Sequence, residues 1–197
     1  MLLLAIVLLW TLKQSKNYYL QHYEVIAMLF EKKSWHKLYN NAVPYSDAAN
    51  VLNAKIPSKC DSRYKHRLLS AAVYEALAIE HYLKALYFVR YNKEYDERGR
   101  KNHDFYTLYT ALPQQIRKDI EGQFVLLLEK REMIDVLEVE DRDNIKIPRD
   151  MIGTLKLWAN TFMHLRLCPT IPVSINLFFF SELEMVLKEQ ILTVRPD

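Results

Sequence analysis

One long amphipathic stretch, beginning near Leu68, constrains the fold of this 197-residue chain more than any other feature. Its apolar residues recur at spacings of three and four, which predicts a helix with one face in a core. The helix is predicted to run from about Arg63 to Tyr91. Its core-facing residues are Leu69, Ala72, Val73, Ala76, Leu83, Leu86 and Tyr87.

Glu80 lies inside this apolar stripe, four residues after Ala76 and three before Leu83. A carboxylate on an apolar face is costly unless it is paired. Lys84 follows one helical turn later, within reach on the same side of the helix. We therefore expect a polar pair beside the most apolar surface of the helix.

A charged loop follows the long helix, and a second, short helix is expected to open at Asn102. Asn102 is the predicted N-cap, and Asp104 in the first turn would complement the helix dipole. Polar groups beside a core are usually satisfied by hydrogen bonds. A structural His103 would therefore cap this helix and bond to Glu80 or to a backbone carbonyl.

Two segments of this region resemble motifs of the HEPN family, a group of small α-helical bundles. Residues 78–86 read Ala-Ile-Glu-His-Tyr-Leu-Lys-Ala-Leu, similar to an E-x-x-L-K-A-L helix, and residues 102–108 resemble a G-H-D-L-x-x-L helix start. Residues 157–166 are similar to the family's late F-x-x-x-R-Y helix, although Leu167-Cys168-Pro169 replaces its continuation. The resemblance implies an all-α fold, a single up-and-down bundle of about five or six helices.

The composition fits this class and disfavours others. Three glycines in the whole chain argue against an all-β fold, and they stand too far apart to form a phosphate-binding loop. Cys60 and Cys168 lack metal-type spacing, which indicates reduced thiols in a cytosolic protein. We therefore expect no metal site and no cofactor.

Residues 17–197 are predicted to form one domain, after an apolar segment at residues 1–16. The run Leu177–Phe180 is apolar all round, which suggests a doubly packed helix, for instance at a subunit interface. Two helices are expected before the long one, at residues 18–37 and 45–52, separated by a break at Pro44. Three more are expected after the short helix. They run from Pro113 into the acidic loop at 141–146, from Asp150 through Leu165, and over residues 173–192.

The first twelve residues, Met1 to Leu12, are almost wholly apolar. They are fewer than the roughly 20 residues that span a bilayer. They also lack the basic start and the small-residue cleavage site of a signal peptide. Three interpretations stay open: an element packed on the domain, a membrane-targeting segment, and a misplaced start or truncation.

Arg98 and His103 satisfy the spacing Arg, four residues, His. Family members that cleave RNA use a similar R-x4-6-H motif. His103 at a helix N-terminus would serve as a neutral base toward the 2′-hydroxyl, and Arg98 would hold the phosphate without a metal ion. In the family this motif usually lies on a later helix, so a structural His103 is the alternative.

The remaining binding candidates are chosen for charge and position. The net charge of +3 is small for a dedicated nucleic-acid binder, and the positive charges are local. All 13 tyrosines lie between Tyr18 and Tyr109, which indicates packing at the core boundary or, alternatively, base stacking. The candidate binding residues are Glu80, Lys84, Arg100, Lys101, Asn102 and Arg166.

Three functions compete at this point. The first is a cytoplasmic, homodimeric module that binds RNA or a nucleotide; the resemblance implies a stress or phage-defence role beside a nucleotidyltransferase partner. The second is a metal-independent endoribonuclease that uses Arg98 and His103. The third is an accessory protein attached to a membrane through residues 1–12.

Overall fold

The computed structural model describes residues 35–54, 65–95, 103–159 and 179–194. Within these ranges the chain contains helices and no β-strand, which confirms the predicted all-α class. None of the helices described is long and apolar enough to cross a membrane. The helical segments are residues 35–53, α2 (Lys65–Tyr91), α3 (Phe105–Thr110), α4 (Gln114–Lys130), α5 (Ile134–Asp143), α6 (Met151–Ala159) and α8 (Phe180–Val194).

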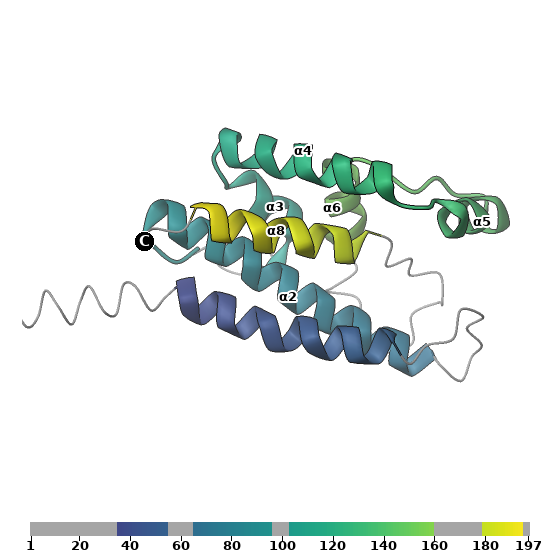
Figure 1. The fold of residues 1–197 in the computed structure, drawn as a ribbon, viewed down its shortest axis with the longest axis horizontal. Coiled ribbons are helices and arrows are strands. Elements are labelled where there is room, and N and C mark those ends of the chain that lie inside the picture. Colours follow the sequence, from purple (N-terminus) through teal and green to yellow (C-terminus); the bar gives the residue numbers. More distant parts are fainter. Residues whose placement is uncertain (1–34, 55–64, 96–102, 160–178, 195–197) are drawn as a thin grey trace, which may run out of the picture.

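Helix α2 is the axis of the bundle (Figure 1). The helix at residues 35–53 runs along one side of α2, and α8 packs along α2 and against α4. Helix α3 contacts both α2 and α6. Helix α5 follows α4 at one end of the molecule (Figure 1).

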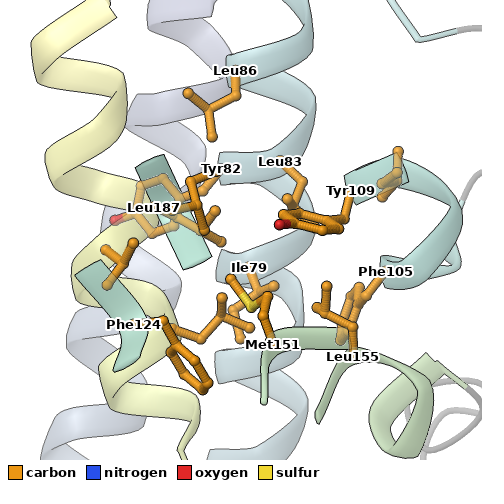
Figure 2. Close-up of a cluster of buried hydrophobic side chains, with 14 of the residues drawn as sticks. Ile79, Tyr82, Leu83, Leu86, Phe105, Tyr109, Phe124, Met151, Leu155 and Leu187 are labelled. Carbon is orange, nitrogen blue, oxygen red and sulfur yellow. The ribbon is translucent and has the colours of Figure 1, made fainter. Parts of the chain in front are cut away.

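The predicted long helix is confirmed to its last residue, Tyr91. Asn92 then adopts a left-handed conformation with φ 51°, a common way to end a helix. Four of the seven predicted core residues are buried, and Leu69, Val73 and Tyr87 are partly buried. Figure 2 shows the core around α2, which includes Ile79, Tyr82, Leu83, Leu86, Phe105, Tyr109, Phe124, Met151, Leu155 and Leu187.

Residues 35–53 form one continuous helix, so the predicted break at Pro44 is wrong. Proline lacks an N–H donor and crowds the preceding turn, which costs a helix interior about 3 kcal/mol. Trp35, Ala42 and Ala49 are nonetheless buried at seven-residue intervals on both sides of Pro44. This packing keeps the segment helical, because tertiary contacts override local propensity.

The helix after Pro113 ends earlier than expected, and α5 is a separate helix. Arg131 between them is extended, and its guanidinium pairs with Asp135 of α5 and Glu182 of α8. Ile134 at the start of α5 is 63% exposed. The core-facing residues of α4 are Ile116, Ile120, Phe124 and Leu128, all of which are buried.

Helix α8 begins at Phe180 and not near Val173, because Phe179 takes a left-handed conformation with φ 71°. The ring of Phe179 packs edge-on against Phe124, and Phe180 packs against Trp158. These two residues of the apolar run are therefore buried within the single chain. Residues 1–16 and the remaining residues of the apolar run lie outside the described ranges.

Candidate functional site

Glu80, Lys84 and His103 form one polar cluster where α2 meets the start of α3. Lys84 Nζ lies 2.7 Å from Glu80 Oε1, and His103 Nδ1 lies 3.0 Å from each carboxylate oxygen. The side chains of Glu80, Lys84 and His103 are 5%, 15% and 32% exposed. The predicted pairing of Glu80 is confirmed. Side-chain exposure increases from Glu80 in the core to His103 near the surface.

The contact with Glu80 fixes the chemistry of the His103 ring. A carboxylate only accepts hydrogen bonds, so His103 Nδ1 carries the hydrogen and donates it. In a neutral ring, the basic lone pair then lies on Nε2. A carboxylate that orients an imidazole in this way is a frequent part of catalytic and binding sites.

The N-cap of α3 is Asp104, so the predicted caps, Asn102 and His103, are wrong. Asp104 Oδ1 accepts a hydrogen bond of 2.8 Å from the backbone N–H of Thr107. His103 precedes the cap, and its ring bonds to Glu80 of α2. The Tyr91 hydroxyl donates to the Ala111 carbonyl at 3.3 Å, so this segment is tied to α2 at both ends.

The structure does not describe the other predicted site residues. Arg98, Arg100, Lys101 and Asn102 lie outside the described residues, and so does Arg166. The pairing of an arginine with His103 at a scissile phosphate therefore stays a prediction.

An aromatic row continues from Lys84 along α2. Tyr87 and Tyr91 follow at steps of three and four, so the three side chains share one face of the helix. The ring centroids of Tyr87 and Tyr91 are 4.6 Å apart, and Tyr95 meets Tyr87 edge-on at 5.0 Å. Tyr91 is 43% exposed. Tyr82 and Tyr109, by contrast, are fully buried, in line with the expected packing role.

Sequence reasoning missed a pair of interacting carboxyl groups, Glu75 of α2 and Glu184 of α8. Glu75 is 6% exposed, and its Oε1 accepts a 2.7 Å hydrogen bond from Asn53 Nδ2. Its buried Oε2 has no hydrogen-bond partner among the described residues. Glu184 accepts a hydrogen bond from the hydroxyl of Ser46. Glu75 lies three residues after a core alanine and four before Ile79, a spacing that could have revealed it.

Both carboxyl groups are shifted toward their neutral forms. Burial raises the pKa of Glu75 from 4.5 to about 7; the Asn53 hydrogen bond opposes this shift, and Glu184 and Glu182 add to it. Burial also raises the pKa of Glu184, against the hydrogen bond from Ser46. Burial where α2 and α8 meet the helix at residues 35–53 therefore favours the protonated form of both carboxyl groups.

No group of three or more His, Cys, Asp or Glu in the described part of the chain could hold a metal ion. Comparisons with protein-family models, with curated proteins and with solved structures find no match to this chain. Function is therefore inferred from the residues themselves.

Replacing His103 tests its tie to Glu80. His103→Ala leaves the buried carboxylate one donor short and is expected to lower the free energy of unfolding by about 1–3 kcal/mol. His103→Asn is the matched control, because its amide N–H can take the place of Nδ1–H and should recover most of this loss. Urea unfolding followed by circular dichroism measures both; equal losses in the two variants would show that the donor to Glu80 is unimportant.

Proposed function

We propose that this chain is a HEPN-like module that binds single-stranded RNA or a nucleotide and acts as a homodimer. The observation that supports this best is the row on α2 in which Lys84, paired with Glu80, lies on the same helix face as the stacked rings of Tyr87 and the exposed Tyr91.

The chemistry of this row suits a nucleotide. Bases stack on aromatic side chains with little regard to sequence, while cations attract the phosphates. Tyr91 offers an exposed ring, and Arg90 and Lys93 are exposed beside it in sequence. Lys84 is largely compensated by Glu80, so most of the attraction for phosphate falls to these two exposed cations.

The proposed setting comes from the resemblance of residues 78–86 and 102–108 to the HEPN family. It implies a cytoplasmic stress or phage-defence system in which a nucleotidyltransferase is the partner protein. The RNA or nucleotide would then lie in the groove between two protomers.

Tyr91→Ala tests the stacking. Removing a ring that stacks on a base is expected to weaken RNA binding about tenfold, because stacking contributes roughly 1–3 kcal/mol per base. Tyr91→Phe is the control: it keeps the ring, loses only the hydroxyl bond to the Ala111 carbonyl, and should bind like the wild type. The measurement is fluorescence anisotropy with a labelled single-stranded RNA of about 12 nucleotides at fixed salt.

Two results would refute the binding proposal. One is the absence of saturable RNA binding by the wild-type protein. The other is equal affinity in Tyr91→Ala and Tyr91→Phe, provided that circular dichroism shows both variants to be folded.

A metal-independent endoribonuclease is the second candidate, and the contact between His103 and Glu80 favours it. With Nδ1 held by the carboxylate, Nε2 is the nitrogen that would accept the 2′-hydroxyl proton, and Arg98 would hold the phosphate. The expected result is cleavage of the same RNA without added metal, lost in His103→Asn although that variant stays folded. Intact RNA after incubation with the wild type would reject the endoribonuclease and leave the binding module as the remaining candidate.

A further inference from the structure

The helix at residues 35–53 contributes one polar donor to each of two carboxyl groups, of which Glu75 is buried and Glu184 is partly buried. The Ser46 hydroxyl donates to Glu184 of α8, and Asn53 Nδ2 donates to Glu75 of α2. Ser46 is itself 3% exposed, so this contact is inside the protein. The helix therefore contacts α2 and α8 through hydrogen bonds to their acidic side chains as well as through apolar packing.

Ionisation of these two groups is unfavourable while the helix is docked. An ionised Glu75 would leave a charged, buried oxygen with no hydrogen-bond partner in the described part of the chain, and the charge of Glu184 adds to the repulsion. Within the same residues the buried hydroxyl of Tyr82 also has no hydrogen-bond partner, and the Glu184 charge acts on it. Release of the helix would let water reach all three groups.

The neighbouring charges do not offset the cost of ionising Glu75 and Glu184. Glu182 acts on Glu75 with the same sign, although it is paired with Arg131. Asp47 acts on Glu184 with the same sign, and Lys188 is the cation that opposes it. On α2, burial lowers the pKa of His81, whose ring stacks on Tyr45 at 5.7 Å, so this histidine does not supply a compensating charge near neutral pH.

We propose that the helix at residues 35–53 is a proton-controlled clamp, docked on α2 and α8 while Glu75 and Glu184 are neutral and released as they ionise. The direction follows from linkage. The docked state holds the Glu75 proton more tightly than a released state with the ordinary pKa of 4.5, so docking is strongest below that pH. It weakens as the pH rises from 4.5 to about 7 and changes little above that range.

Hydrogen exchange of the full chain tests the clamp at pH values of about 5.5 and about 7.5, with intrinsic exchange rates corrected. The opening constant of residues 35–53 should rise at least about tenfold between these two pH values. Between the released pKa of 4.5 and the docked pKa of about 7, ionisation of Glu75 raises this constant by up to tenfold for each pH unit. Peptides from α4 serve as the internal control and should not change by this factor.

Charge-removing variants complete the test. The double variant Glu75→Gln/Glu184→Gln keeps an acceptor oxygen for Asn53 and for Ser46, and it should hold residues 35–53 protected at both pH values. Glu189→Gln, an exposed position on α8, should behave like the wild type. The clamp is overturned if residues 35–53 exchange equally at both pH values, if α4 accelerates by the same factor, or if the pH dependence survives in the double variant.

Discussion

Helix α2 is covered by other helices on almost every side, and the polar groups that it buries depend on that cover. From Ala71 to Val89, Tyr74 is the single residue of α2 classed as exposed. A carboxylate on such a helix has no bulk water around it, so a partner or a proton has to neutralise it. The two buried glutamates of α2, Glu75 and Glu80, meet this requirement in opposite ways.

Glu80 is neutralised by partners. Lys84 lies one turn away on the same helix, and His103 reaches it from the start of α3. Glu75 has an amide donor on one oxygen and, among the residues described, none on the other, so its neutral form is favoured. The first arrangement fixes α3 on α2 beside the proposed RNA-binding row. The second makes the docking of residues 35–53 depend on pH.

The sequence predicts those parts of this arrangement that are local. Glu80 and Lys84 are one helical turn apart, so their pairing follows from helix geometry alone. Glu184 and Ser46, by contrast, are 138 positions apart, and no short-range pattern brings them together. The sequence does not predict the continuous helix through Pro44 or the helix break at Arg131, because both depend on contacts between distant segments. Packing around Ala42 and Ala49 outweighs the proline, and the Arg131 guanidinium reaches across to Glu182 of α8.

The most direct test of this account is the coupling energy between Glu80 and His103. A double-mutant cycle with Glu80→Ala, His103→Ala and the double variant, followed by urea unfolding, isolates their interaction from the separate losses. We predict a coupling of about 1 kcal/mol or more, typical of residues in one hydrogen-bond network. Losses that add to within about 0.3 kcal/mol would contradict it, because the two residues would then contribute independently to stability.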